Sequence, residues 1–444
     1  MYGKSPCLDA VLSNVHKKQA QSLVKSDETK NRLCEKERIS CKLCAAARFL
    51  WYGRLTEKKK NLRTGCPSDE GGKHMFEITR LTVEHLAAGC VTDCSTPRIG
   101  FSLSSDRRGA QLADAELTVG DWSAHVTSGQ SAAYVGPALL PFTTYSVRLN
   151  ATDDAGETAT ATTAFETGRM ETPWKGRWIS DPSYHFTEAK VSPVPMVFRK
   201  EITTNKPIAR ARLYATAMGI YEAELNGQKL GEQYFAPGFT SYKSYLQYQT
   251  YDVTEQLKSS EGMENELIAV VGGGWAVGSF TYKRVNRNYA DRQALLCELR
   301  ITYEDGSEEI IGTDESWEVT LDGAVRETEF YNGEIYDATV DMDKIAWHKA
   351  SREQVKLQPE ILAQYGAPVK AHEVFHPVSV TKAPSGVVIY DFGQNFAGVI
   401  SAKNQRYLRQ YRSRFWLLSD LECALFCLWD KHIIRFCISD FKER

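Results

Sequence analysis

The stretch Leu139-Leu140-Pro141-Phe142-Thr143-Thr144-Tyr145-Ser146-Val147-Arg148-Leu149-Asn150-Ala151 sets the expectation for the fold of this chain. Tyr145, Val147, Leu149 and Ala151 alternate with polar residues, as the two faces of a half-buried β-strand require. Asp153-Asp154-Ala155-Gly156 follows and reads as a turn. The stretch therefore predicts a strand of an antiparallel sheet that is buried on one face.

This strand resembles strand F of a fibronectin type III domain, with Tyr145 as the tyrosine of the corner. Residues 160–165 predict a further strand, and Glu166-Thr167-Gly168 would close the domain. Period-two alternation begins at Phe76. We therefore expect a first sandwich at residues 76–170.

A second, larger unit follows the tryptophan-rich linker that begins at Pro173. Residues 209–216 alternate as a half-buried strand, and Asn226-Gly227 is a strong hairpin-turn signal. Residues 267–271 form a continuous apolar run, which predicts a strand buried on both faces. Many short strands without a long amphipathic helix predict a jelly-roll sandwich at residues 175–345.

A third sandwich is expected to start at residues 370–402, with strands at Val378, Val380 and residues 387–390. The fold class is therefore all-β, as tandem β-sandwiches. After Ser401 the alternation stops, and residues 403–444 form an atypical tail. An amphipathic helix is one interpretation of this tail, and a change of reading frame or a wrongly assigned gene end is the other.

Residues 1–74 read as a basic leader that we expect to be disordered. Cys41-x-x-Cys44 offers one close ligand pair, whereas a strong zinc signal needs two. The chain has 444 residues and a net charge of −2, so nothing steers it toward nucleic acid or a membrane. No apolar run is long enough for a signal sequence or a membrane span. Between residues 95 and 422 the sequence has a single cysteine, Cys297. These features together favour a cytoplasmic protein.

Gly272-Gly273-Gly274-Trp275, Gly333-Glu334-Ile335-Tyr336-Asp337-Ala338 and Tyr390-Asp391-Phe392-Gly393-Gln394-Asn395 resemble motifs of bacterial α-L-rhamnosidases. Further segments match in that family's order: residues 80–84, 96–101, 221–227, 235–242, 248–254 and 289–292. The resemblance implies N-terminal sandwich domains that precede a catalytic (α/α)6 barrel. It also implies an inverting hydrolase of terminal α-L-rhamnose in glycosides or polysaccharides, with no organic cofactor.

No segment of this sequence resembles the helical hairpins of that barrel, so no catalytic residue is assigned. Carboxylates of the matched segments are expected to be solvent-facing strand or turn residues: Glu222, Glu224, Glu334, Asp337 and Asp391. The chain is thus interpreted as an N-terminal fragment with accessory domains. A stand-alone rhamnose-binding lectin and a non-functional truncated gene product are the alternatives.

A sugar site wants aromatic rings for the apolar C–H faces of the sugar and planar polar groups for its hydroxyls. The segment between residues 275 and 291, with Asn226, supplies the candidates: Trp275, Tyr282, Arg287, Tyr289, Asp291 and Asn226. The alternative is that Trp275 and Tyr289 are core aromatics and that Arg287 pairs with Asp291. The resemblance implies that calcium can accompany such a site. Asn226 and Asp291 are the candidate ligands, whereas His348 and His376 are expected to be structural.

Overall fold

The computed structural model describes residues 75–402 and 413–416. Within the first range it leaves out residues 87, 186–190, 258–262, 282, 331–332, 338, 385–387 and 397. The predicted leader 1–74 and most of the tail 403–444 therefore lie outside the described residues. Apart from the four-residue helix α2 (Gly274–Val277), every regular element of the described part is a strand.

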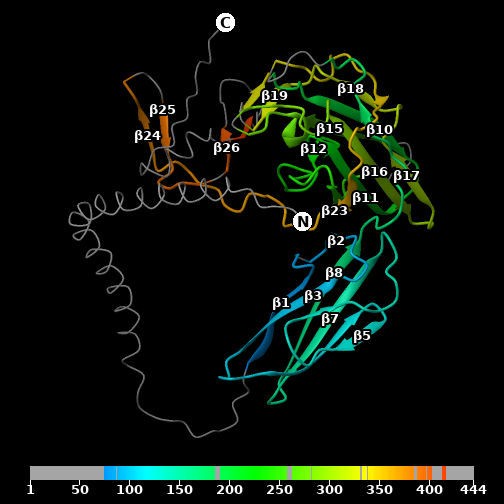
Figure 1. The fold of residues 1–444 in the computed structure, drawn as a ribbon, viewed down its shortest axis with the longest axis vertical. Helices are drawn as coiled ribbons and strands as arrows, with labels where there is room; N and C mark the ends of the chain where they lie inside the picture. The colour runs from blue at the N-terminus through cyan, green and yellow to red at the C-terminus, as the bar shows by residue number, and fades with distance from the viewer. Residues whose placement is uncertain are drawn as a thin grey trace, which may run out of the picture. The chain divides into compact units, whose positions relative to one another are not determined.

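The first sandwich is drawn in blue to cyan in Figure 1 and has two sheets. The smaller sheet has the strand order β1 (Phe76–Val83), β3 (Arg98–Ser105), β6 (Ser131–Ala133). The larger has the order β2 (Cys90–Thr92), β8 (Thr158–Thr167), β7 (Thr144–Asp153), β4 (Leu112–Val119), β5 (Trp122–His125). Ile99, Leu117, Leu149 and Phe165 are fully buried between them.

Tyr145 forms the corner that its sequence predicts. Its hydroxyl oxygen accepts a hydrogen bond of 2.8 Å from the backbone N–H of Leu140, five residues upstream. Its ring stacks on Phe165, with 5.5 Å between the ring centroids. The tyrosine therefore ties the entry into β7 to the core of the sandwich, as in immunoglobulin-like domains.

The second sandwich is drawn mainly in green to yellow in Figure 1. One sheet has the order β13 (Gln228–Lys229), β12 (Ile220–Leu225), β15 (Met263–Gly272), β10 (Met196–Thr204), β18 (Glu318–Thr320), β21 (His348–Lys349). The other has the order β22 (Ser351–Arg352), β9 (Ile179–Ser180), β16 (Ala294–Tyr303), β11 (Ile208–Met218), β14 (Tyr245–Asp252), β23 (Glu360–Ala363), with β17 (Glu308–Gly312) on β16. Strands beyond residue 345, the expected end of this domain, thus pair into both sheets.

Two strand predictions for this sandwich have different outcomes. The Asn226-Gly227 turn is present between β12 and β13, with φ of +52° and +73° at the two residues. The prediction that residues 267–271 are buried on both faces is wrong. Leu267, Ala269 and Val271 are buried, but Ile268 and Val270 on the other face are only partly buried. The sequence does not reveal this alternation in burial, because the residues on both faces of the strand are apolar.

Hairpins complete the described part. β24 (Ser379–Lys382) pairs with β25 (Val388–Asp391), β26 (Val399–Ala402) with β27 (Ser413–Trp416), and β19 (Val325–Glu329) with β20 (Gly333–Tyr336). The predicted strands around Val378, Val380 and Tyr390 correspond to the first of these. The fold class is all-β, as predicted from the sequence. Among the described residues, no helix has the length and apolar character that crossing a membrane would demand.

Residues of the first sandwich bond directly to strands of the second. The Tyr248 hydroxyl donates to Asp93 Oδ1 over 2.8 Å, and the N–H of Ala363 donates to Asp93 Oδ2 over 2.7 Å. The guanidinium of Arg212 pairs with the carboxylate of Glu166 at 2.6 Å. The carboxylate of Asp93 therefore accepts hydrogen bonds from two strands of the second sandwich, β14 and β23.

Candidate functional site

The connection between β15 and β16, residues 273–293, carries the predicted site segment and begins with helix α2. Gly274 has φ +52°, and a Cβ atom at this position would lie 2.7 Å from Ile220 Cγ2 and 2.8 Å from its N. Only glycine therefore lets the loop approach β12 this closely. Trp275, the next residue, is the second residue of α2.

Trp275 belongs to what we call the aromatic loop cluster: Phe235, Phe239, Trp275, Phe280 and Phe330. The Trp275 ring stacks on Phe330, with 4.2 Å between centroids and 28° between planes. Phe239 lies 5.6 Å from Trp275 and 5.7 Å from Phe280. Phe330 is buried, whereas Phe239 is 54% exposed. Phe239 is therefore the most exposed ring of the cluster, whereas Trp275 is partly buried and stacked on Phe330.

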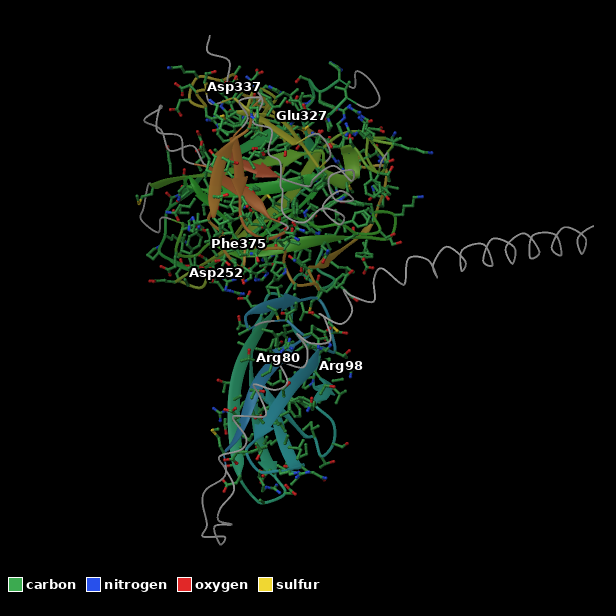
Figure 2. All side chains as sticks on the ribbon, turned by 90° about the vertical axis from the view of Figure 1, so that its left-hand side faces the viewer. Arg80, Arg98, Asp252, Glu327, Asp337 and Phe375 are labelled. Atoms are coloured by element: carbon green, nitrogen blue, oxygen red, sulfur yellow. The ribbon has the colours of Figure 1, made fainter. Side chains whose placement is uncertain are left out.

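A carboxyl group is buried beside this cluster. Glu329, the last residue of β19, is 2% exposed, and its Oε2 accepts a 2.8 Å hydrogen bond from the N–H of Ser279. Burial raises the pKa of Glu329 to about 7; the Ser279 bond lowers it, the charge of Glu327 raises it, and the charge of Arg287 lowers it. Glu327, labelled in Figure 2, is two residues earlier on the same strand. Glu329 thus holds a proton at a higher pH than an ordinary glutamate does.

The predicted site residues divide into separate groups. Tyr289 stacks on Tyr242, with 4.9 Å between centroids, and both pack on a buried apolar cluster. The Arg287 guanidinium donates to the Tyr184 hydroxyl over 2.7 Å, while the ion-pair partner of Asp291 is Lys356. The alternative ion pair between Arg287 and Asp291 is therefore not formed. Tyr282 lies outside the described residues.

Asn226 is not part of the loop cluster. It follows the last residue of β12, whereas Gly274 contacts Ile220 at the first residue of that strand. Six residues of strand separate the two ends by about 20 Å. The side chain of Asn226 donates to Gln256 O and to Asn265 Oδ1, each at 2.9 Å, and accepts from the N–H of Glu266. It is a structural turn residue.

Asn226 and Asp291, the candidate calcium ligands, each bond to other groups of the protein. Calcium binds six to eight oxygens, and the carbonyl oxygen of the Asn226 amide is already used within the turn. In the described ranges, no group of three or more His, Cys, Asp or Glu side chains is arranged to hold a metal ion. His348, expected to be structural, bonds to the buried Asp181 at 2.8 Å.

Two residues were not among the candidates predicted from the sequence: Phe239 of the aromatic loop cluster, and Glu329 beside it. Phe239 belongs to the segment 235–242, which carries part of the family resemblance. The sequence did not indicate that its ring is exposed. Glu329 stands in a short polar strand whose sequence gives no sign of burial. Its carboxyl group is covered by Gly278 and Ser279, which are distant in sequence.

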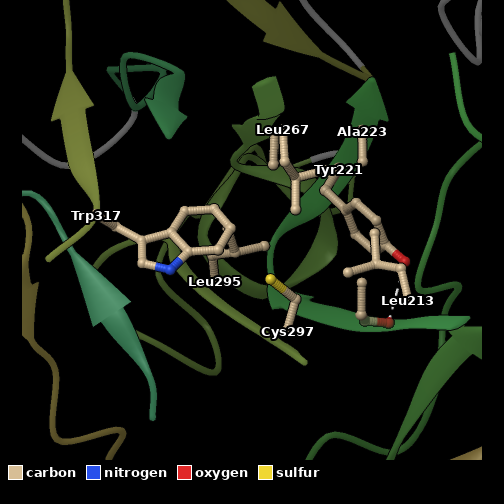
Figure 3. A pocket seen from close by; sticks show the side chains of 9 residues that line it. Leu213, Tyr221, Ala223, Leu267, Leu295, Cys297 and Trp317 are labelled. Atoms are coloured by element: carbon tan, nitrogen blue, oxygen red, sulfur yellow. Dashed lines mark hydrogen bonds between the residues drawn. The ribbon is translucent and has the colours of Figure 1, made fainter. Parts of the chain in front are cut away.

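A void in the core of the second sandwich is not a candidate site. Figure 3 shows the nine side chains that line it: Leu213, Ala215, Tyr221, Ala223, Leu267, Ala269, Leu295, Cys297 and Trp317. The lining is apolar except for the Tyr221 hydroxyl, which already donates to Ala215 O. A small apolar void without convergent polar groups is a packing feature of the two facing sheets.

Two family profiles match this chain. Residues 78–171 match the Rha78A-like, N-terminal immunoglobulin domain, and residues 206–382 match the alpha-L-rhamnosidase N-terminal domain. An α-L-rhamnosidase from Streptomyces avermitilis is 35% identical over 204 residues, which are 44% of this chain and 19% of that protein. One from Alteromonas sp. is 30% identical over 254 residues, 54% of this chain and 27% of that protein.

Solved structures agree with these matches. The α-L-rhamnosidase from Dictyoglumus thermophilum aligns with TM-score 0.63 and 25% identity, over 72% of this chain and 39% of that one. The enzyme from Aspergillus terreus gives 0.66 and 25%, over 74% and 41%. The Streptomyces avermitilis enzyme complexed with L-rhamnose gives 0.62 and 21%, over 74% and 50%, a likeness of fold alone. The chain spans roughly a fifth to a quarter of the two curated relatives named above.

Proposed function

We propose that this chain, which consists largely of the N-terminal sandwich domains of an α-L-rhamnosidase-like protein, serves the hydrolysis of rhamnose-containing glycosides or polysaccharides. Its part in that reaction is to contact the sugar. The observation that carries the proposal is the consecutive match of two rhamnosidase-specific domains, residues 78–171 and 206–382, to two sandwiches. A single sandwich of this kind would be compatible with many functions.

The chemical step is assigned to other parts of such a protein. Glycoside hydrolysis needs two carboxyl groups on opposite sides of the scissile bond, one of them as an acid with a raised pKa. Glu329 has a raised pKa, but it is 2% exposed under the aromatic loop cluster, where a glycosidic oxygen does not reach it. We therefore expect this chain alone to release no chromophore from an aryl α-L-rhamnoside above a mock preparation.

Sugar contact is assigned to Phe239. Its exposed ring contacts the rings of Trp275 and Phe280, which restrict its motion, so little side-chain entropy is lost when a ligand stacks on it. The apolar C–H face of a rhamnose ring, with its methyl group, fits such a ring. This assignment replaces Trp275 as the platform expected from sequence.

The test is calorimetric titration with L-rhamnose. We expect weak binding, with a Kd on the order of 0.1–10 mM, because a small ligand buries few atoms. Phe239→Ala should abolish binding while the melting curve stays near that of the wild type. Tyr365→Ala is the matched control, because Tyr365 is 55% exposed but belongs to another region. The same titration with a calcium chelator tests whether calcium takes part.

Absence of binding by the wild type would reject sugar contact by this chain. Binding that survives Phe239→Ala but is lost in Tyr365→Ala would move the site away from the aromatic loop cluster. Hydrolysis at an ordinary enzymatic rate would contradict the assignment of chemistry to other parts of the protein.

A further inference from the structure

The carboxyl group of Glu329 occupies the space beneath the β15–β16 loop. A Cβ atom on Gly278 would lie 2.7 Å from Glu329 Oε2 and 2.8 Å from Oε1. The next residue, Ser279, donates its N–H to Oε2 over 2.8 Å. The loop therefore lies directly on the carboxyl group, and glycine at position 278 permits that approach.

Two polar atoms at this contact have no hydrogen-bond partner among the described residues: Glu329 Oε1 and Ser279 Oγ. Their residues are 2% and 0% exposed, so water does not satisfy them. A buried carboxylate with one unsatisfied oxygen is unfavourable. Oε1 and Ser279 Oγ do not bond to each other, so a proton taken up from solvent favours the closed loop by neutralising the buried charge.

The neighbouring charges do not neutralise a carboxylate here. Arg287, on the loop, uses its guanidinium on the Tyr184 hydroxyl at 2.7 Å and also lowers the pKa of Glu329. Glu327, on β19, accepts from the Ser192 hydroxyl at 2.6 Å and opposes ionisation of Glu329. The effects of these two charges on Glu329 are opposed, and burial, the largest influence, favours its protonated form.

We propose that Glu329 is a proton-dependent anchor for the β15–β16 loop. In its protonated form the carboxyl group is neutral, accepts the N–H of Ser279 at Oε2 and keeps the loop closed on β19. Loss of the proton leaves a charged, incompletely bonded group beneath the loop and favours opening. Because the loop carries Trp275 and Phe280, opening also removes the support of Phe239.

The pKa of Glu329, raised by burial to about 7, agrees with this geometry and fixes the pH range of the effect. The open loop exposes Glu329 to water, where its pKa returns to its ordinary value of 4.5. Opening should therefore become about tenfold more favourable for each pH unit between 4.5 and 7, and constant above 7.

Amide hydrogen exchange of peptides from residues 273–290, followed by mass spectrometry from pH 5 to pH 8, tests the anchor. After correction for intrinsic exchange, protection in the wild type should fall by about tenfold per pH unit up to pH 7 and then level off. Glu329→Gln, which cannot ionise, should show protection independent of pH. Glu327→Gln is the matched control, which should keep the pH dependence but level off at lower pH because a like charge is removed.

Protection that does not change with pH in the wild type would overturn the anchor, as would a dependence that persists in Glu329→Gln. If Glu329→Gln does not fold, the wild type labelled with ¹³C at its glutamate carboxyl groups can be titrated by NMR instead. The proposal would be overturned if every glutamate titrated below pH 6. The effect on sugar affinity, which should fall over the same pH range, rests on the proposed function. If L-rhamnose binds at no pH, that function fails, whereas the exchange result still decides the anchor.

Discussion

The guanidinium of Arg169 and the carboxylate of Glu298 form an ion pair, with 2.9 Å between Nη1 and Oε1 and only 2% and 0% of the side chains exposed. Arg169 follows β8 of the first sandwich, and Glu298 is in the middle of β16 of the second. Arg169 also lies 3.9 Å from the Trp174 ring centroid and donates to the carbonyl oxygens of Thr172 and Pro173. Both terminal nitrogens of Arg169 are thus bonded, and among the described residues only its Nε has no partner.

Replacing Arg169 should destabilise the protein strongly. Arg169→Met leaves the Glu298 carboxylate buried without its main partner, and we expect a loss of about 3–5 kcal/mol in the free energy of unfolding. Urea unfolding followed by fluorescence measures it. Lys206→Met is the control, because Lys206 and Asp305 are about half exposed and such a pair contributes about 1 kcal/mol or less. Equal losses in the two variants would contradict a special role for the buried pair.

The same pair should make the protein sensitive to acid. Burial alone would raise the pKa of Glu298, but the hydrogen bonds and charge of Arg169, with the N–H of Lys175 and the guanidinium of Arg300, hold it below its ordinary value of 4.5. A lowered pKa in the folded state stabilises the protein above pH 4.5, and this stabilisation is lost as the pH falls further. The stability difference between the wild type and Glu298→Gln should therefore shrink from pH 5 to pH 3. A constant difference would show that Glu298 does not titrate with folding.

Trp275 and Phe239 should respond differently to truncation. Trp275→Ala removes a ring stacked at 4.2 Å on Phe330 and should cost about 3 kcal/mol of folding stability. Phe239→Ala removes a largely exposed ring and should cost about 1 kcal/mol or less. Thermal melts of both variants measure this contrast, and the reverse order would mean that Trp275, not Phe239, faces solvent.

Cys297 should resist alkylation in the native state. It is 3% exposed in the core of the second sandwich, and burial raises its pKa far above the ordinary value, so almost no thiolate forms. Iodoacetamide followed by peptide mass spectrometry should label the partly exposed Cys94 long before Cys297. In denaturant the two should react at similar rates. Early labelling of Cys297 would indicate that this core opens readily.

The hydrogen bond of the tyrosine corner should contribute measurably to the stability of the first sandwich. Tyr145→Phe keeps the ring on Phe165 but removes the acceptor for the Leu140 N–H, which should cost about 1 kcal/mol. Thr144→Val, at an exposed position next to it, is the control and should cost less. Chemical unfolding of both variants gives the comparison, and identical stabilities would mean that water replaces the corner bond.

The local backbone conformation of several strands and turns follows from the amino-acid sequence alone. The alternation from Tyr145 to Ala151 predicts β7, and the Asn226-Gly227 turn predicts the β12–β13 hairpin. Both follow from the two-residue period of a strand and from the few residues that tolerate positive φ. Ordered motifs also indicated the resemblance to rhamnosidases. The segment containing Trp275 lies in the loop between β15 and β16, and the candidate residues lie in separate groups.

Which side chains are buried, and which contact one another, depends on the tertiary structure. Arg169 and Glu298 are 129 residues apart, and no local pattern pairs them. Glu329 is buried because Gly278 and Ser279 arrive from the β15–β16 loop, and Phe239 lies against Trp275 and Phe280 of the same loop. A strand's period fixes on which face a residue lies, but whether that face is covered depends on elements distant in sequence. Burial, and with it the pKa of Glu329, is therefore a property of the packed sandwich and not of the residue's own neighbours.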